Sequence, residues 1–267
     1  MTRRVRLDAE LVRRGLARSR EQAAELVTAG QVRVPGRTSV KPATQVGVAE
    51  PIVLAEPAGA TYVSRGGHKL AGALDAFAGS GLSVTGRSAL DAGASTGGFT
   101  DVLLRRGAVR VVCVDVGYGQ LAWSLRTDPR VEILDRTNVR ELDPVAVGEP
   151  VDVVVADLSF ISLRLVLPAL VRPTRADADL VLMVKPQFEV GKDVVGAGGV
   201  VRDPALRAAS VRDVAASAYG LGLGVCGVTA SPLPGPAGNV EYFLWLRRDA
   251  PPLDDAQLMT ALREGPQ

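Results

Sequence analysis

The sequence predicts an α/β fold: a mostly parallel seven-stranded sheet with an antiparallel last strand, preceded by a small α+β domain. From Ser88 onward, short β-branched runs alternate with helical patterns, an order typical of parallel sheets flanked by helices. Runs such as Val153–Ala156 are apolar without interruption, which indicates strands buried on both faces. A short loop, Ser231–Asn239, joins the last two runs, so we expect those two strands to pair antiparallel.

The strands and helices of this larger domain follow one another along the chain. The predicted strands are Ala89–Asp91, Arg110–Val116, Val131–Leu134, Val151–Asp157, Leu180–Lys185, Gly224–Ala230 and Tyr242–Arg247. The predicted helices are Phe99–Arg106, Gln120–Arg126, Ile161–Leu170 and Pro204–Tyr219. The final segment contains Pro251-Pro252 and a weak apolar pattern, which fits either a short terminal helix or a disordered tail.

The charge of the chain is unevenly distributed. Its 267 residues include 31 basic and 29 acidic side chains, a net charge of +2. Residues 1–45 hold ten basic and four acidic residues, whereas the remainder holds 21 and 25. Such asymmetry indicates a basic module joined to a mildly acidic one. We therefore expect a first domain at residues 1–55, a linker at 56–63, a second domain at 64–250 and a tail at 251–267.

The basic module has a readable order of elements. Apolar residues recur at helical spacing in Leu7–Val12, and Ser19 stands three residues before Gln22, a pattern that starts a second helix. Gly30 is placed to end that helix. The valines of Val32–Val46, interrupted by a Pro-Gly turn, predict a small hairpin or bent strand pair.

Few side chains of this protein can change protonation near neutral pH. Only four of the 31 basic residues are lysines and His68 is the single histidine, whereas arginine stays charged. A multi-histidine metal site is therefore excluded, and we expect no metal. Cys113 and Cys226 lie in apolar runs and indicate buried thiols in a reducing compartment. The N-terminus lacks a signal-peptide pattern and no apolar run is long enough to span a membrane, so we expect a cytoplasmic protein.

A glycine-rich junction between the first strand and first helix of the larger domain predicts a cofactor site. The segment Leu90–Phe99 has the spacing Gly-x-x-x-Gly-Gly, and the helix that follows it offers free N–H groups to an anion. This spacing counts against a dinucleotide-binding dehydrogenase, as does the absence of a proton-relay histidine. A second carboxylate, Asp115, follows Asp91 by 24 residues, where it can bind both hydroxyls of a ribose. We expect a nucleoside-type cofactor such as S-adenosylmethionine, held by Asp91, Gly93, Ala94, Ser95, Gly97, Gly98, Phe99, Asp115, Asn138 and Asp157.

Three methyl-transfer chemistries would leave different residues at such a site. Methylation of a base amine requires a proline-containing clamp after the fourth strand, where this sequence reads Asp-Leu-Ser-Phe at 157–160. Covalent methylation of a base carbon requires an exposed cysteine, and both cysteines lie within predicted strands. Methylation of a ribose hydroxyl requires positioning and a general base, which a lysine can supply because burial favours its neutral form. Lys69 and Lys185 are therefore candidates.

The carboxyl edge of the predicted sheet gathers these groups. Lys185 and Asp157 end neighbouring apolar strands, at the edge where ligands of open α/β folds bind. Glu241 begins the last strand and reaches the same edge if that strand is antiparallel. In order and setting, Lys69, Asp157, Lys185 and Glu241 resemble the Lys-Asp-Lys-Glu tetrad of FtsJ-type 2′-O-ribose methyltransferases, and the Asp-x-Gly-x-x-x-Gly-Gly segment resembles their cofactor loop.

The first domain carries a second resemblance. Residues 3–50 resemble the RNA-binding domain named after ribosomal protein S4, through Arg6-Leu7-Asp8, Leu11, Gly15, Ser19-Arg20, Ala23, Leu26, Gly30, Val32, Val34, Gly36 and Lys41-Pro42. With this domain in front, the chain to about Arg247 resembles the TlyA (haemolysin A) family. In the cofactor loop, Ala-Ser-Thr at 94–96 departs from the Ala-Ala-Pro usual in FtsJ-type enzymes.

The resemblance implies a Rossmann-like S-adenosylmethionine-dependent methyltransferase that modifies cytidine 2′-hydroxyls in the ribosomal RNA of both subunits. It implies that Lys185 is the general base, that Asp157 and Lys69 set its charge state and hold the target ribose, and that Glu241 orients the lysine or the hydroxyl. The residues expected to contact RNA are Arg3, Arg4, Arg6, Arg13, Arg14, Arg18, Arg20, Arg65 and His68.

Two other functions remain alternatives at this point. The haemolysin label suggests a membrane-lysing protein, for which the sequence offers no long amphipathic basic helix. A non-catalytic RNA-binding or assembly factor would retain the fold, although the intact tetrad and cofactor loop argue against it.

Overall fold

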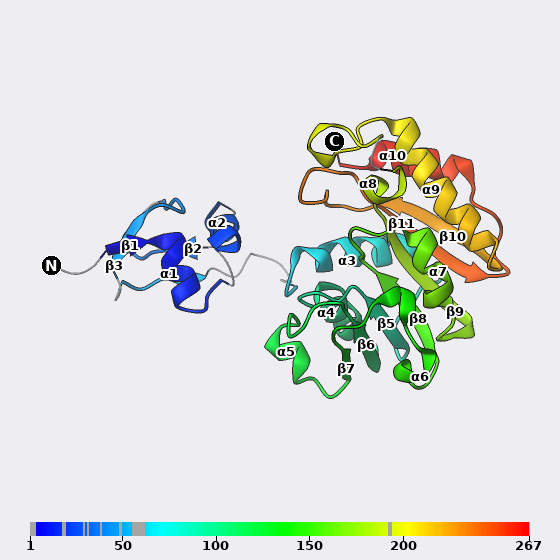
Figure 1. The fold of residues 1–267 in the computed structure, drawn as a ribbon, viewed down its shortest axis with the longest axis horizontal. Helices are drawn as coiled ribbons and strands as arrows, with labels where there is room; N and C mark the ends of the chain where they lie inside the picture. Colours follow the sequence, from blue (N-terminus) through cyan, green and yellow to red (C-terminus); the bar gives the residue numbers. More distant parts are fainter. Residues whose placement is uncertain are drawn as a thin grey trace. The chain divides into compact units, whose positions relative to one another are not determined.

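The computed structural model divides into two compact units, Met1–Thr61 and Tyr62–Gln267, which we describe separately (Figure 1). It describes residues 4–17, 20–28, 30, 32–37, 39–47, 50–54, 62–191 and 194–266.

The first unit combines two helices with two short strand pairs in its described residues. Its elements are β1 (Arg4–Arg6), α1 (Leu7–Arg13), α2 (Arg20–Thr28), β2 (Val32–Arg33), β3 (Gln45–Gly47) and β4 (Val53–Leu54). Strand β1 pairs antiparallel with β3, and β2 pairs antiparallel with β4. The buried side chains of both helices and of Val32, Val34 and Val46 form one apolar core.

The hairpin expected across Val32–Val46 is wrong. Val32 lies opposite Leu54, and Val46 lies opposite Val5. The valines do share one core, but backbone turns such as the bond from Thr44 N to Lys41 O direct each strand to a partner elsewhere in the chain. The two helices agree with the sequence-based expectation, whereas Ser19, expected to start the second one, lies outside the described residues.

The second unit is built on a seven-stranded sheet in the order β10-β11-β9-β8-β5-β6-β7. Its strands are β5 (Ser88–Ala92), β6 (Arg110–Val114), β7 (Val131–Leu134), β8 (Val151–Ala156), β9 (Thr174–Val184), β10 (Leu223–Ala230) and β11 (Tyr242–Arg248). Strands β7, β6, β5, β8 and β9 are mutually parallel, and β11 lies antiparallel between β9 and β10. The predicted α/β fold with an antiparallel last strand is confirmed.

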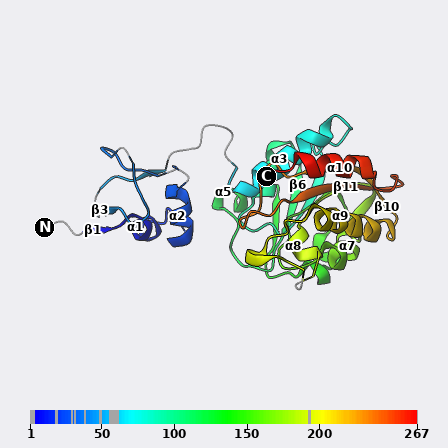
Figure 2. The ribbon, with the colours of Figure 1, turned by 90° about the horizontal axis from the view of Figure 1, so that it is seen from above.

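Helices cover both faces of this sheet (Figures 1 and 2). One face carries α3 (Arg65–Ala78), α4 (Gly98–Arg105) and α5 (Trp123–Arg126), which pack on alternate strand residues such as Val111 and Val155. The opposite face carries α6 (Pro144–Val147), α7 (Leu163–Val171), α9 (Pro204–Tyr219) and α10 (Asp255–Glu264), which pack on intervening residues such as Val112 and Val154. The period-2 alternation of a strand explains why uninterrupted apolar runs fill two separate cores.

The structure contains helices that the sequence did not predict, among them α3 and α8, and it decides between the two alternatives for the tail. Helix α3 has three glycines among its first eight residues, which weakens the helical signal of its sequence, yet Leu70, Leu74 and Phe77 are buried along one side. The tail forms α10, whose Leu258 and Ala261 are buried, so the helical alternative for this segment is correct. A four-residue helix, α8 (Pro186–Glu189), begins one residue after β9 ends.

Candidate active site

Two lysine–carboxylate pairs lie at the carboxyl edge of the sheet. Lys185 Nζ lies 2.5 Å from Asp157 Oδ1, and Lys69 Nζ lies 2.5 Å from Glu241 Oε2. Asp157 and Lys185 directly follow the parallel neighbours β8 and β9. Because β11 is antiparallel to β9 and Tyr242 lies opposite Val184, the preceding residue, Glu241, lies beside Lys185 in the register. The topology thus gathers all four predicted residues of the tetrad.

The Lys185 amine is held between two segments. It donates a hydrogen bond to Ser159 Oγ at 3.0 Å and forms its ion pair with Asp157. Asp157 Oδ1 is buried, and it accepts no directed hydrogen bond from the described residues. The side chain of Lys185 is only 9% exposed, so this amine is shielded from bulk water.

The glycine-rich loop closes the site on its other side. Gly93 has φ +84°, and a Cβ at this position would lie 2.7 Å from the carbonyl oxygen of Asp157. Glycine is therefore required both by the left-handed backbone and by the close approach of the two strand ends. The residues Ser64, Gly66, Gly93, Ala94, Ser95, Thr96, Gly98, Phe99 and Asp157 line a small cavity of about 110 Å³.

A larger cavity of about 450 Å³ shares Gly93, Ser95 and Asp157 with the small one. Asp115 lies in its wall, where Oδ2 accepts a hydrogen bond from Ser95 N at 2.8 Å and Oδ1 accepts one from Gly117 N at 2.7 Å. The remaining lining is mainly apolar and includes Val114, Val116, Val139, Leu158, Phe160, Ile161 and Val166, with Gln120, Asn138 and Ser159 as polar members. An elongated ligand with one polar and one flat apolar part fits two adjoining cavities of this kind.

Two residues predicted to bind the cofactor line neither cavity among the described residues. Asp91 is fully buried, and its Oδ2 accepts a hydrogen bond from Thr100 Oγ1 at 2.7 Å. Burial raises the pKa of Asp91 to about 7, against the opposing effect of that hydrogen bond. Gly97 has φ +96°, and a Cβ there would overlap Leu125 and Leu121. Asp91 and Gly97 therefore support the loop through contacts on its buried side.

The sequence-based prediction missed part of the cavity wall. Ser64 and Gly66 come from the start of α3, and the stretch Leu158–Ile161 follows Asp157. Within that stretch, Phe160 is 92% exposed and has a left-handed backbone with φ +64°, a conformation that costs energy in a bulky residue. The sequence could have indicated this stretch, because it directly follows Asp157 at the end of a strand.

The cysteines take no part in this site. Cys113 is buried in β6 beside Thr100, and burial raises the pKa of its thiol. Cys226 lies in β10, where burial also raises the pKa of the thiol. A covalent mechanism requires an accessible thiolate, so the structure is consistent with the exclusion of base-carbon chemistry.

The predicted RNA-contacting arginines of the first unit include two paired sets. Arg6 and Arg20 both bind the buried carboxylate of Asp8, while Arg13 and Arg14 both bind the buried carboxylate of Glu10. The hydrogen bond from Arg6 holds the pKa of Asp8 at about 2, and that from Arg13 holds the pKa of Glu10 at about 2. Arg4 is exposed, and Arg3 and Arg18 lie outside the described residues.

Arg65 and His68 lie on the exposed side of α3, near the site. Arg65 Nη2 lies 3.5 Å from the carbonyl oxygen of Pro234, in the loop that leads to Glu241. His68 packs edge-on against Tyr62 with 5.1 Å between the ring centroids. Both side chains remain accessible to a large substrate.

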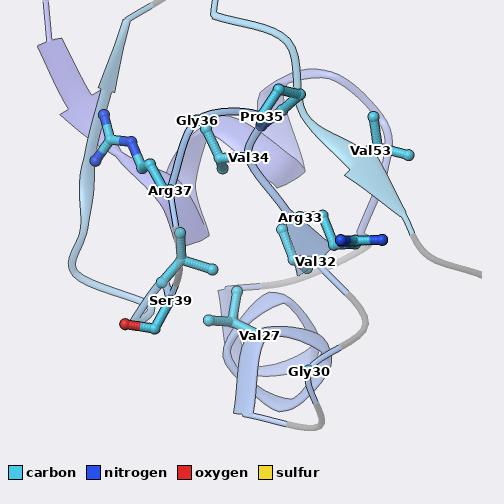
Figure 3. Close-up of a pocket in the computed structure, with 11 residues that line it drawn as sticks. Val27, Gly30, Val32, Arg33, Val34, Pro35, Gly36, Arg37, Ser39 and Val53 are labelled. Carbon is cyan, nitrogen blue, oxygen red and sulfur yellow. The ribbon is translucent and has the colours of Figure 1, made fainter.

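A separate cavity of about 770 Å³ lies in the first unit (Figure 3). Its lining is dominated by valines, and its polar side chains are Arg33, Arg37 and Ser39. It contains no carboxylate or lysine among the described residues, so it offers no general base. The catalytic candidates therefore belong to the second unit. Across the described parts of both units, no cluster of three or more His, Cys, Asp or Glu side chains could bind a metal ion.

Comparison with known proteins gives the chain a family. A model of FtsJ-like methyltransferases matches residues 62–248, and a model of the S4 domain matches residues 5–52. The chain is 62% identical, over the full length of both proteins, to one from Mycobacterium tuberculosis named 16S/23S rRNA (cytidine-2′-O)-methyltransferase TlyA. The chain belongs to the TlyA family of FtsJ-like methyltransferases. Both resemblances expected from the sequence are confirmed.

Other proteins similar to this TlyA-family chain carry another description. Hemolysin A of Brachyspira hyodysenteriae is 35% identical to it, over 90% of this chain and 98% of that protein. A solved structure from Streptococcus thermophilus, described as a hemolysin, has a TM-score of 0.77 at 37% identity and covers 99% of this chain and 98% of its own. Among the described helices of this chain, none has the length and apolarity needed to cross a membrane.

Proposed function

We propose that this protein transfers a methyl group from S-adenosylmethionine to the 2′-hydroxyl of cytidine in ribosomal RNA of the small and large subunits. The observation that carries the proposal is the placement of a shielded lysine amine, an acceptor-bearing carboxylate and a two-part cavity at one edge of the sheet. The name of the Mycobacterium tuberculosis relative supports the reaction and the substrate. Such a substrate places the work of the protein in the cytoplasm.

The cavities fit S-adenosylmethionine. Asp115 offers carboxylate oxygens for the ribose hydroxyls, and Asn138 adds a polar group in the same wall. The apolar side chains of Val116, Leu158 and Ile161 suit the adenine ring. The N-terminus of α4, with Gly98 and Phe99 in the wall of the small cavity, suits the carboxylate of the methionyl part. When bound, the cofactor would supply an electrophilic methyl group attached to a sulfonium. The leaving group would be a neutral thioether, which needs no metal assistance.

The chain's own residues then prepare the hydroxyl. In its neutral form, Lys185 accepts the proton of the 2′-hydroxyl at Nζ, which lies between Asp157 and Ser159, and it becomes the ammonium of the ion pair. Asp157 binds the resulting ammonium through Oδ1. Lys69 and Glu241 neutralise each other's charge in a buried pair, so they hold the edge of the site rigid and orient the incoming ribose.

The first unit supplies RNA affinity. S4-type modules bind structured RNA by shape and phosphate contacts, and the exposed guanidinium groups of Arg4, Arg6, Arg13 and Arg20 are suited to phosphate. In the second unit, the exposed side chains of Arg65 and His68 offer further RNA contacts beside the site. Chemistry and substrate selection are thereby assigned to different units of the chain.

The direct test is incubation of the purified protein with S-adenosylmethionine labelled on the methyl group and with separated ribosomal subunits. We expect label in RNA from both subunits, resistant to alkaline hydrolysis at the next phosphodiester because the 2′-oxygen is blocked. Label on a base, or label in protein alone, would contradict the proposal. The Lys185→Ala protein serves as the matched negative control.

A further inference from the structure

Two segments carry the polar groups around Lys185, and three side-chain contacts join them. The first segment, residues 157–162, follows β8, and the second, residues 185–189, follows β9. Lys185 contacts Asp157 and Ser159, and the Phe160 and Phe188 rings lie 5.3 Å apart between centroids. The third contact is made by Glu189, which the methyl-transfer mechanism does not use.

Glu189 is a buried carboxylate with both oxygens occupied. Its side chain is 2% exposed. Oε2 accepts a hydrogen bond from Ser162 Oγ at 2.5 Å, and Oε1 accepts one from Leu163 N at 2.7 Å. Arg164 Nε lies 3.4 Å from Oε2 and supplies the opposite charge. A buried carboxylate with this many donors fixes its partners firmly, because losing any of them leaves a charge without compensation.

The partners of Glu189 define its effect on the site. Ser162 and Leu163 begin α7, directly after the stretch that carries Asp157, Ser159 and Phe160. Glu189 ends α8, four residues after Lys185. The carboxylate therefore joins the far end of one segment to the far end of the other, while Lys185 and Asp157 meet at their near ends.

We propose that Glu189 is a positioning residue for methyl transfer: by holding residues 157–162 against α8, it sets Asp157 and Ser159 at contact distance from the Lys185 amine. The inference rests on the function proposed above. Among the described residues, Glu189 lines neither of the two cavities, so it acts through its neighbours. A displacement of about 1 Å at a reacting group lowers turnover by about 100-fold.

The test compares two changes at Glu189 with a matched loss of a helix cap elsewhere. Glu189→Ala removes both hydrogen bonds, whereas Glu189→Gln keeps a carbonyl oxygen that can accept one of them. Asp254→Ala removes the carboxylate that accepts from Ala256 N at the start of α10, a cap of the same kind outside both cavity linings. Melting temperature, S-adenosylmethionine affinity, kcat and KM for ribosomal subunits are measured at a temperature where each variant is folded.

We expect kcat to fall about 100-fold in Glu189→Ala and about tenfold in Glu189→Gln, with KM for the subunits changed less than threefold. Asp254→Ala should melt at a lower temperature and keep kcat within about twofold of the wild type. A folded Glu189→Ala protein with wild-type kcat, or an equal loss of kcat in Asp254→Ala, would overturn the assignment.

A second readout does not depend on turnover. The wild type and variants are exposed briefly to acetic anhydride, and acetylation of Lys185 is quantified by peptide mass spectrometry. Release of the 157–162 segment should expose the amine and raise its acetylation rate about tenfold in Glu189→Ala, with no change in Asp254→Ala. An unchanged rate in Glu189→Ala would refute the positioning role. An inactive wild type that still shows this difference would refute the proposed function alone.

Discussion

Lys69 Nζ lies 2.5 Å from Glu241 Oε2, and the two side chains are only 8% and 1% exposed. The pair joins α3, near the beginning of the second unit, to the residue that precedes its last strand. Removing one partner of such a buried pair strands the other charge, whereas removing both together can be nearly neutral.

Lys69→Met should therefore lower the free energy of unfolding by about 3–5 kcal/mol. The double change Lys69→Met with Glu241→Leu should recover most of that loss without recovering methyl transfer. Urea unfolding followed by circular dichroism measures the first effect, and the subunit assay measures the second. A double variant less stable than either single one would show that the pair contributes net stability.

Lys185→Arg separates charge from proton transfer at the candidate base. Arginine retains the positive charge opposite Asp157 but stays protonated, so turnover should fall about 10²–10⁴-fold, as for loss of a general base. Lys185→Ala should abolish methyl transfer as well. Titration calorimetry should show S-adenosylmethionine bound with nearly wild-type affinity by both variants. Substantial turnover by either of them would remove Lys185 from the role of base.

Gly93→Ala tests the close approach between the cofactor loop and Asp157. The added Cβ would lie 2.7 Å from the carbonyl oxygen of Asp157, so the loop must shift and S-adenosylmethionine affinity should fall at least about tenfold, as expected for about 1.4 kcal/mol. Gly81→Ala is the matched control, because Gly81 has φ +99° but nothing within 4 Å of its added Cβ in the described structure. It should lose about 1–2 kcal/mol of stability and keep its affinity. Equal losses of affinity in both variants would assign the effect to backbone strain alone.

Asp91 should make the stability of the second unit fall as pH rises through the neutral range. Burial raises the pKa of Asp91 to about 7, against about 3.9 in an unfolded chain. Between these values the folded state holds a proton that the unfolded state releases, so the free energy of unfolding decreases as pH increases. Asp91→Asn cannot ionise at this position, so the free energy of unfolding of the wild type should fall relative to that of the variant from pH 4 to pH 7. A pH-independent difference in urea unfolding would contradict this account.

The first unit should show the opposite pH dependence, with a stability that decreases as pH falls. Arginine partners hold the pKa of Asp8 and of Glu10 at about 2, below the ordinary values near 4. The stability stored in these pairs is fully present above pH 4 and is lost as pH falls toward 2. Hydrogen exchange of residues 4–17 in the intact protein, corrected for intrinsic rates, should accelerate in Glu10→Gln at pH 5 and lose part of its acid sensitivity. Glu21→Gln, at an exposed acid of α2, should behave as the wild type does.

The sequence predicted the sheet, and the placement of three candidate site residues at its edge, because both follow from local patterns. Strands buried on two faces must be apolar throughout, and polar residues that end such strands can lie only at the sheet edge. The edge position of Asp157, Lys185 and Glu241 therefore followed from strand ends, whereas their grouping with Lys69 came from the resemblance to FtsJ-type enzymes. Helix α3 was missed because its early glycines mask a buried stripe that only tertiary packing stabilises.

Other features depend on contacts between distant residues. The pairing of Val46 with Val5 spans about forty residues, and no local pattern distinguishes it from a hairpin. Gly97 and Gly98 are adjacent in one motif, yet Gly98 lines a cavity while Gly97 makes room for Leu125. The contacts of Glu189 with Ser162 and Leu163 join two loops whose approach exists only in the folded sheet.

The position of β11 links activity to biosynthesis. Among the described strands β11 comes last along the chain, yet it lies inside the sheet, between β9 and β10. Glu241 directly precedes it and reaches the site when β11 pairs with β9. A nascent polypeptide that has formed β5 to β9 therefore has a cofactor loop and a Lys185–Asp157 pair but lacks the partner of Lys69. Because domains fold as units during translation, premature termination anywhere before residue 248 should yield an inactive fragment, so methyl transfer requires a chain that extends through β11.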